Sequence, residues 1–384
     1  MKRAIAILLS LALVFSSVFF VVGCKEPPDD TPADTLPDEP IIDPRIVEIT
    51  EDFIDVFWNA EHKMFYTINT KHIAGRSGPL FGLYSDFWWE AQNWETVMDI
   101  YERQGGEYYL TLVDDVYDGF LQYYDDYQKN EYNDDIGWWA MGCTRAYAIT
   151  GNERYLTDAK EMFDYIYQYK DDAVGGGLYW KNTGDNPSKN VCTNAPAATT
   201  AARLSVHLDD PSYLQIAREL FDWLKTSLYE EETGKVNDTK NANDGSVNDW
   251  QFSYNYGTFA RVAYELYKVT GEEDYMEYVY KSLDYYIATR LTNGIAIKSG
   301  GGMGDETAFR TILFRTLNEI AKTSRPDYQQ VINDNALSAY NNRRDSDKLC
   351  GFNWTVVPKD DELITSTVAG AGVALMQYYQ ELGD

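Results

Sequence analysis

The sequence predicts an all-α protein, an (α/α)6 barrel in which six helical hairpins close into a toroid. One observation behind this prediction is a junction motif of Gly or Asp, acidic residues and an aromatic residue that recurs along the chain. The steps between its aligned tyrosines are 46, 58, 62 and 53 residues, for Tyr109, Tyr155, Tyr213, Tyr275 and Tyr328. A period of about 55 residues fits one helix pair with its loops, since Gly ends one helix and the acidic turn begins the next.

The second observation is that the segments on the two sides of each junction differ. Residues 153–168, which follow a junction, are amphipathic, whereas residues 192–206, which precede one, hold a single charge, Arg203. Residues 365–380 hold no charge. A helix that is apolar on every side is buried on every side. Buried helices alternating with amphipathic ones favour a closed two-layer ring over an open solenoid, which usually has tighter periods and a capping repeat.

This pattern predicts twelve helices and the place of a functional cleft. The helices are expected at roughly 45–60, 86–103, 107–127, 134–150, 153–169, 192–207, 211–228, 251–269, 273–290, 305–323, 326–342 and 365–382. Long connections precede the buried helices, at 61–85, 170–191, 229–250, 291–304 and 343–364. Because long connections commonly carry function, the cleft should lie where the inner helices begin.

The N-terminus has the features of a targeting segment. Lys2 and Arg3 precede an apolar run, and the sequence up to Cys24 resembles a bacterial lipobox, in which the cysteine is lipidated after cleavage. Residues 1–24 are therefore interpreted as a lipoprotein signal peptide, although about 20 apolar residues could also span a membrane. Residues 25–44 hold six of the twelve prolines and seven acidic residues, as an extended linker would.

The linker also bears on localisation and domain organisation. An acidic tract directly after a lipidated cysteine resembles the surface-export signal of Bacteroidetes lipoproteins. We therefore expect a single catalytic domain at 45–384, held by its lipid at the outer-membrane surface of a Gram-negative bacterium. The lipid would be its only contact with the membrane, and the domain is expected to be a monomer.

Charge and cysteine usage exclude several classes of function. The net charge of −28 disfavours nucleic acid, because phosphate binding needs clustered Lys and Arg. It also suits a neutral substrate better than an anionic one. With three histidines in the whole chain and no CxxC pair, we expect neither a metal site nor a cofactor. Cys143, Cys192 and Cys350 are expected to be buried thiols.

One of the seven Asp-Asp pairs stands out as catalytic. Asp134 and Asp135 begin an inner helix, face the predicted cleft and are followed by two tryptophans. Helix capping is the competing explanation, and the pair at 125–126, at the end of an outer helix on the cleft side, is the main competitor. In glycoside cleavage one carboxylate must be ionised and the other protonated. Neighbouring like charges separate their pKa values in this way.

Aromatic residues gather at the same helix ends. Sugar rings stack on aromatic faces through their C–H surfaces, although Trp and Tyr also fill protein cores. The candidates are Trp88, Trp89, Trp138, Trp139, Tyr179, Trp180, Trp250, Phe252, Tyr254 and Trp354.

Five stretches together resemble glycoside hydrolase family 76, the α-1,6-mannanases. They are Phe87-Trp88-Trp89-Glu90-Ala91, Asn133-Asp134-Asp135 with Trp138-Trp139-Ala140, Gly177-Leu178-Tyr179-Trp180, Thr193-Asn194-Ala195-Pro196-Ala197 and Phe252-Ser253-Tyr254-Asn255-Tyr256-Gly257. The resemblance covers about residues 50–323. It implies an (α/α)6 barrel and retaining endo-cleavage of α-1,6-mannan, with Asp134 as nucleophile and Asp135 as acid/base.

The resemblance also implies a set of substrate-binding residues. Asn194, Tyr254 and Asn255 fall where the family lines its cleft, and the cleft-side aromatics Trp88, Trp89, Trp138 and Trp180 are expected to join them. Tyr256 departs from the family, which usually has Gln there. That departure affects the expected subsites and linkage preference. The family also contains fungal cell-wall transglycosylases.

Three other functions remain open at this point. Unsaturated glucuronyl hydrolases share the barrel and use Asp, but their anionic sugar calls for cationic side chains. Sugar 2-epimerases share the toroid and use His; the three histidines here are His62, His72 and His207. A non-catalytic glycan-binding lipoprotein would keep the aromatics and would not need the Asp pair.

Overall fold

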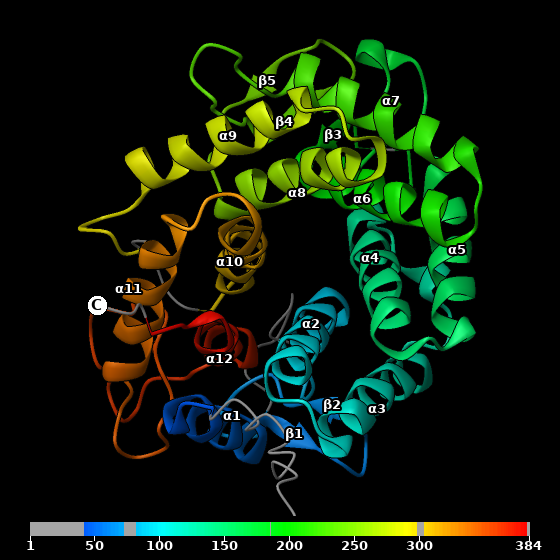
Figure 1. Ribbon diagram of the computed structural model, residues 1–384. Helices are drawn as coiled ribbons and strands as arrows, with labels where there is room; N and C mark the ends of the chain where they lie inside the picture. The colour runs from blue at the N-terminus through cyan, green and yellow to red at the C-terminus, as the bar shows by residue number, and fades with distance from the viewer. Residues whose placement is uncertain (1–41, 73–81, 185, 298–302, 382–384) are drawn as a thin grey trace, which may run out of the picture. The chain divides into compact units, whose positions relative to one another are not determined.

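The structure is a computed structural model that describes residues 42–72, 82–184, 186–297 and 303–381 of the 384-residue chain. Within these residues twelve α-helices form two concentric layers (Figure 1). Their bounds are α1 (Pro44–Phe57), α2 (Phe87–Gln104), α3 (Glu107–Tyr123), α4 (Asn133–Thr150), α5 (Glu153–Tyr167), α6 (Val191–His207), α7 (Pro211–Ser227), α8 (Ser253–Thr270), α9 (Asp274–Arg290), α10 (Glu306–Thr323), α11 (Tyr328–Asn341) and α12 (Ser366–Tyr378). Even-numbered helices form the inner layer and odd-numbered helices the outer one, which confirms the (α/α)6 barrel.

The inner layer is a closed ring. Each inner helix packs against the next, and α12 packs against α2. Every residue of α12 is buried, as the absence of charge predicts. Small residues let neighbouring helices approach closely: a Cβ on Gly257 of α8 would lie 2.6 Å from the Cα of Leu313 in α10. The closed ring excludes the open solenoid.

The predicted junctions end inner helices and begin outer ones. Gly151 and Gly271 follow α4 and α8 in the left-handed region, at φ 67° and 71°, where a side chain would be strained. The next helices are then capped. The side chain of Asn152 accepts a hydrogen bond from the Arg154 amide at 3.2 Å, and Asp210 accepts one from Ser212 at 2.9 Å.

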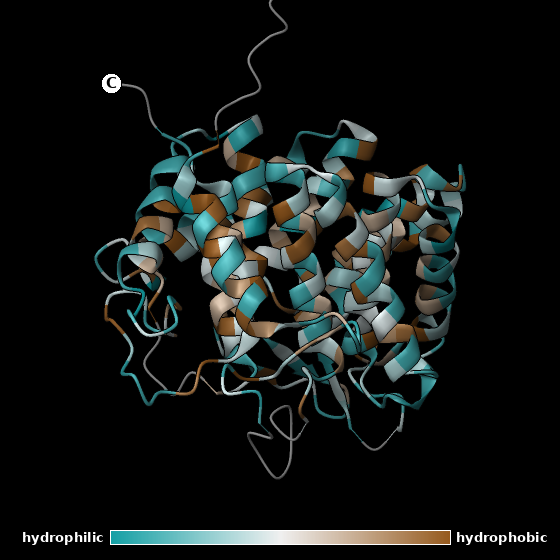
Figure 2. Ribbon diagram, turned by 90° about the horizontal axis from the view of Figure 1, so that it is seen from below, coloured by the Kyte–Doolittle hydropathy of each residue, from teal (hydrophilic) through white to brown (hydrophobic). Residues whose placement is uncertain are grey.

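The two ends of the barrel differ (Figure 2). The short junctions lie at one end, the junction end, and the longer connections lie at the other, the loop end. The loop end carries the short strands β1 (Trp58–Asn59), β2 (Met64–Phe65), β3 (Ser188–Asn190), β4 (Thr239–Asn241) and β5 (Val247–Asn248). Antiparallel pairing in the order β3-β4-β5 ties the loop before α6 to the loop before α8. The loop end is thus held by backbone hydrogen bonds.

Predicted and observed helix ends agree within a few residues, with small corrections. The helix expected at 107–127 ends at Tyr123, and the one expected at 365–382 ends at Tyr378. At the start of the domain, the Asp43 side chain accepts from the Arg45 amide at 2.9 Å, so α1 begins at Pro44, inside the expected linker.

The predicted signal peptide at 1–24, with Cys24, and most of the linker lie outside the described residues and stay predictions. In the described part of the chain, no helix is both long enough and apolar enough to cross a membrane.

Candidate active site

A cavity of about 580 Å³ opens at the loop end. Residues at the start of five inner helices, α2, α4, α6, α8 and α10, line it, so it lies where the sequence predicts the cleft. Five carboxylates line it: Asp86, Asp134, Asp135, Asp238 and Asp305. Eight aromatic side chains join them: Trp88, Tyr132, Trp138, Trp180, Trp250, Phe252, Tyr254 and Phe309. Acid groups beside aromatic faces form a site suited to sugars.

Asp134 and Asp135 lie in the first turn of α4. The N-cap residue of this helix is Tyr132, so the pair is not explained as a side-chain cap. Asn130 Nδ2 donates to Asp135 Oδ2 at 2.9 Å. Oδ1 of Asp134 is buried and has no hydrogen-bond partner. A buried acceptor without a partner is uncommon in a protein, and here it adjoins the cavity.

The environment of the pair favours two different protonation states. Burial raises the pKa of Asp134 to about 7, while the Cys192 thiol and the backbone amides at the start of α4 act in the opposite direction. Burial and the charge of Asp134, with that of Asp86, raise the pKa of Asp135 well above its usual value. Asp135 is therefore the partner that holds a proton, and Asp134 is the one that ionises first.

The other carboxylates of the cavity are also raised. Burial and the neighbouring Asp305 raise the pKa of Asp86 to about 6. Burial raises the pKa of Asp305, although the indole N–H groups of Trp88 and Trp89 donate to it at 3.2 Å each. Burial also raises the pKa of Asp238, which accepts from the Tyr254 hydroxyl. Among the described residues no Lys, Arg or His lines this cavity.

Comparison with known proteins identifies the family. The family model described as glycosyl hydrolase family 76 matches residues 56–381. The chain belongs to this family.

Solved members of family 76 share the fold. The GH76A α-1,6-mannanase from Salegentibacter sp. HEL1_6 is similar with a TM-score of 0.78 and 28% identity, over 87% of this chain and 98% of that chain. An inactive variant of that enzyme, with two consecutive aspartates replaced by asparagine, was solved in complex with α-1,6-mannotriose. The GH76 α-mannanase BT2949 of Bacteroides thetaiotaomicron, at 19% identity and a TM-score of 0.74 over 87% of this chain and 94% of that chain, shares the fold.

Curated fungal relatives match over a shorter segment. The mannan endo-1,6-alpha-mannosidase DFG5 of Candida albicans is 29% identical over 206 residues, which are 48% of this chain and 46% of that protein. DFG5 of Saccharomyces cerevisiae is 28% identical over 203 residues, 47% of this chain and 43% of that protein. The chain thus spans about half the length of the curated relatives it matches.

In this family 76 protein, four of the seven predicted substrate-binding residues line the cavity: Trp88, Trp138, Trp180 and Tyr254. The competing aspartates do not. Asp125 is exposed and pairs with Lys129 at 3.2 Å, while Asp126 accepts from the Gln128 amide at 3.1 Å. Asp125 and Asp126 therefore stabilise a turn at the surface.

The structure places the other three predicted residues behind the cavity wall. Trp89, Asn194 and Asn255 are buried and do not line the cavity. The Asn194 side chain accepts a hydrogen bond from the Leu178 backbone N–H at 2.7 Å and donates one to the Leu178 carbonyl oxygen at 3.1 Å. The Asn255 amide donates to the carbonyl oxygen of Trp250 at 3.0 Å. Buried loop backbone needs such partners, so these amides hold the loops that carry Trp180 and Trp250.

Two further expectations are refined. Cys143 and Cys350 are buried thiols as expected, but Cys192 is only partly buried and lines the cavity. Tyr256, the departure from the family pattern, is buried away from the cavity, and its hydroxyl donates to Gln251 Oε1 at 2.9 Å. This tyrosine is therefore not in direct contact with the cavity.

Three acids of the cavity were not predicted from the sequence. Asp86 and Asp305 each directly precede an inner helix, and that shared position was an available signal. Asp238 lies in a loop, and its place depends on the pairing of β3 with β4. Nothing in the local sequence marks it.

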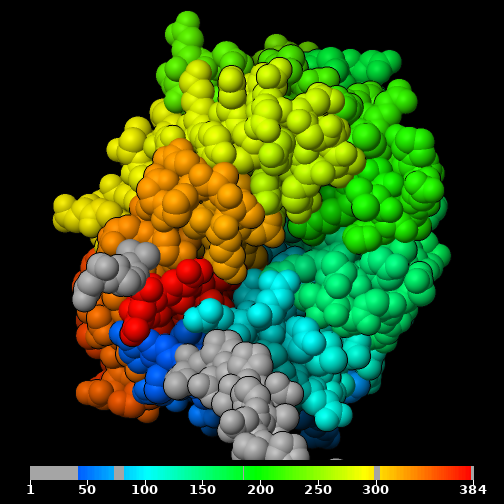
Figure 3. Space-filling model, viewed as in Figure 1, coloured from blue at the N-terminus to red at the C-terminus, as the bar shows by residue number. Residues whose placement is uncertain are grey.

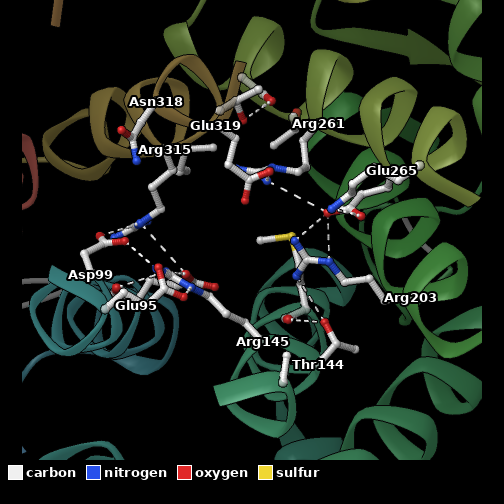
Figure 4. Close-up of a pocket in the computed structure, with 18 of the residues that line it drawn as sticks. Glu95, Asp99, Thr144, Arg145, Arg203, Arg261, Glu265, Arg315, Asn318 and Glu319 are labelled. Carbon is white, nitrogen blue, oxygen red and sulfur yellow. Dashed lines mark hydrogen bonds and ion pairs between the residues drawn. The ribbon is translucent and has the colours of Figure 1, made fainter. Parts of the chain in front are cut away.

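A second cavity of about 490 Å³ lies within the ring toward the junction end (Figure 4). A space-filling view along the barrel axis shows the surface hollowed at the centre of the ring (Figure 3). Charged side chains from the inner helices line the second cavity and pair with one another: Glu95, Asp99, Arg145, Arg203, Arg261, Glu265, Arg315 and Glu319. Trp138 lines both cavities. In the described part of the chain, no group of three or more His, Cys, Asp or Glu could hold a metal ion.

Proposed function

We propose that this family 76 protein is an endo-acting α-1,6-mannanase that cleaves a mannan backbone with retention, with Asp134 as nucleophile and Asp135 as acid/base. The observation that carries the proposal is the adjacent pair on a cavity wall that has no Lys, Arg or His among the described residues, where burial and the charge of Asp134 raise the pKa of Asp135 and so keep it protonated. Retaining glycoside cleavage uses one carboxylate as nucleophile and a neighbouring carboxylic acid as proton donor. The Salegentibacter enzyme supports it, because replacing two consecutive aspartates gave its inactive variant.

The chemistry takes two steps. An ionised oxygen of Asp134 bonds to the anomeric carbon, while Asp135 gives its proton to the glycosidic oxygen, whose bond to that carbon breaks. One part of the chain leaves, and the other remains as a glycosyl ester of Asp134. Asp135, now ionised, takes a proton from water as the water oxygen attacks the anomeric carbon and frees Asp134.

The cavity also weighs against the alternatives. An enzyme for uronate-containing glycans would place cations around its carboxylate, and none lines this cavity among the described residues. An epimerase would use His, and no described histidine lines it. A capture lipoprotein would have no need for an acid pair whose pKa values are raised this far.

The proposal extends to the cellular setting. The protein would be attached through lipidated Cys24 to the outer-membrane surface of a Gram-negative bacterium and would meet the membrane through that lipid alone. It would act as a monomer on a mannan polysaccharide, without nucleic acid as a partner. The net charge of −28 and the lipobox-like sequence support this setting.

Product analysis tests the function. Linear α-1,6-mannan would be incubated with the purified protein, with Asp134→Asn and Asp135→Asn, and with Asp125→Asn as a matched control at the loop end. We expect a ladder of short oligosaccharides from the wild type and the control and none from the two variants. Binding without cleavage by the wild type would favour the capture function, and absence of both would overturn the mannan assignment.

A further inference from the structure

A row of aromatic side chains leads away from the cavity over the loop end. It consists of Tyr124, Tyr123, Tyr84 and Tyr66, whose neighbouring ring centroids lie 5.3, 5.8 and 5.4 Å apart. Tyr124 packs on Phe87, with centroids 5.0 Å apart. The row comes from three separate segments: the C-terminal end of α3, the residue that follows β2 and the residues before α2. None of these tyrosines lines the cavity.

The row begins at the active-site wall. Phe87, on which Tyr124 packs, stands between the cavity-lining residues Asp86 and Trp88. The charges of Asp86 and Asp135 both raise the pKa of Tyr124, after burial. From there the row runs outward to Tyr123, whose side chain is 53% exposed. Tyr66 and Tyr124 are partly buried and Tyr84 is buried, so Tyr123 is the ring that the row exposes to solvent, and ring packing connects it to the wall that carries the acids.

The row is rigid. The backbones of Tyr66 and Tyr84 form an antiparallel bridge, and the Tyr66 hydroxyl accepts from Asn59 Nδ2 at 2.5 Å. The Tyr124 hydroxyl donates to the Ser85 carbonyl at 3.3 Å. A surface of tyrosines that is already ordered loses little entropy when a ligand settles on it.

We propose that this aromatic row is an outer binding site for the mannan chain, which holds sugar units that extend beyond the cavity. This inference rests on the proposed function. Exposed tyrosine offers an apolar ring face together with a hydroxyl, which matches the C–H faces and hydroxyl groups of a neutral sugar. The strongly acidic chain argues against an anionic occupant.

The position of Trp250 also supports a substrate chain that extends beyond the cavity. Trp250 lines the cavity just before α8 and is 61% exposed. In the inner ring α8 lies opposite α2, beside which the row begins (Figure 1). An enzyme that cuts within a chain must hold sugars on both sides of the cleaved bond, and exposed aromatics stand at both sides of this cavity.

The test compares two tyrosines of the same helix. Tyr123 and Tyr108 are both on α3 and are 53% and 57% exposed, but Tyr108 lies at the junction end. We expect Tyr123→Ala to lower kcat/KM on long linear α-1,6-mannan about five- to tenfold, as for loss of one aromatic contact. Activity on α-1,6-mannotriose and the melting temperature should remain those of the wild type, and Tyr108→Ala should match the wild type on both substrates.

Each outcome decides the matter. Equal kcat/KM values for Tyr123→Ala and Tyr108→Ala on the polymer, with an active wild type, would overturn the outer site and leave the mannanase function standing. An equal loss on polymer and mannotriose would place the effect in the cavity and also overturn it. A wild type without activity on either substrate would overturn the proposed function, and this inference with it.

Discussion

The two cavities of the barrel use the same acidic side chains in opposite ways. At the loop end, five aspartates meet without a lining cation among the described residues, and the pKa of each is raised. In the second cavity, four acids each have an arginine guanidinium as partner: Glu95, Asp99, Glu265 and Glu319. Burial acts to raise the pKa of Glu265, but the charges of Arg203, Lys268 and Arg261 together outweigh it and the pKa is lowered.

The comparison shows what makes a buried carboxylate reactive. Burial opposes the charge of Glu319, yet Arg261, with Lys268 and Arg203, lowers its pKa to about 2, so it stays ionised near neutral pH. Such a carboxylate can hold an arginine partner, but it cannot exchange a proton near neutral pH. Burial of Asp135 beside Asp134, without a cation, leaves a group that can. The presence of arginine, more than the presence of acids, separates the two functions.

The largest effect should come from Asp135→Asn. The variant cannot protonate the glycosidic oxygen, so we expect kcat on mannan to fall on the order of 10³-fold, within the range of general acid catalysis. A substrate with an activated aryl leaving group needs no such proton, and its glycosylation step should slow far less. Single-turnover rates on both substrates measure the difference. Equal losses on the two would show that Asp135 is not the acid.

The second cavity should respond in stability and not in chemistry. Arg203 donates to Glu265 at 2.8 and 3.0 Å, and the Glu265 side chain is only 4% exposed. Removing one partner of a buried pair costs about 3–5 kcal/mol, although Lys268, at 2.6 Å from Glu265, should reduce that cost. The Arg203→Leu variant should therefore unfold at a lower denaturant concentration than the wild type, and its kcat on mannan should be unchanged. The double variant Arg203→Leu/Glu265→Leu should recover part of the loss; no recovery would contradict the pairing argument.

The two ends also differ in what the sequence could predict. The helices follow from local signals: Gly151 and Gly271 end inner helices, and the charge-free run that became α12 is buried throughout. The proposed catalytic pair was likewise visible, because Asp134 and Asp135 are adjacent at the start of a helix. Such features need only a few neighbouring residues.

The remaining features depend on distant partners. Asn194 and Asn255 resemble ligand-binding amides in sequence, but each satisfies loop backbone that local sequence cannot place. Asp238 reaches the cavity because β3 pairs with β4, and that register is not encoded locally. The charged residues of the second cavity come from five inner helices, α2, α4, α6, α8 and α10, so Arg203 alone gave no sign of the cluster.

A shift in pH dependence should sharpen the comparison. The proposed mechanism requires ionised Asp134 and protonated Asp135, so kcat/KM should rise with pH through the pKa of Asp134, about 7, and fall again above the pKa of Asp135. Asp86 is ionised above about 6 and helps keep the proton on Asp135. Asp86→Asn should therefore move the alkaline limb to lower pH. Glu319→Gln, in the second cavity, is the control that should leave the profile unmoved; a matching shift there would contradict the local origin.

The smallest effect concerns Trp138, the residue that lines both cavities. It is 3% exposed, so its ring fills the wall between the two cavities. On one side lie the aspartates of the proposed active site, and on the other lie the acids that are paired with arginines. Trp138→Phe keeps an aromatic face but leaves space, and we expect a loss of about 1 kcal/mol in stability with a few-fold rise in KM for α-1,6-mannotriose. The pH profile should stay in place, since Phe adds no charge and a modest space admits little water. A profile that moves toward that of an ordinary exposed carboxylate would show that this wall, and not only the missing cations, keeps Asp135 protonated.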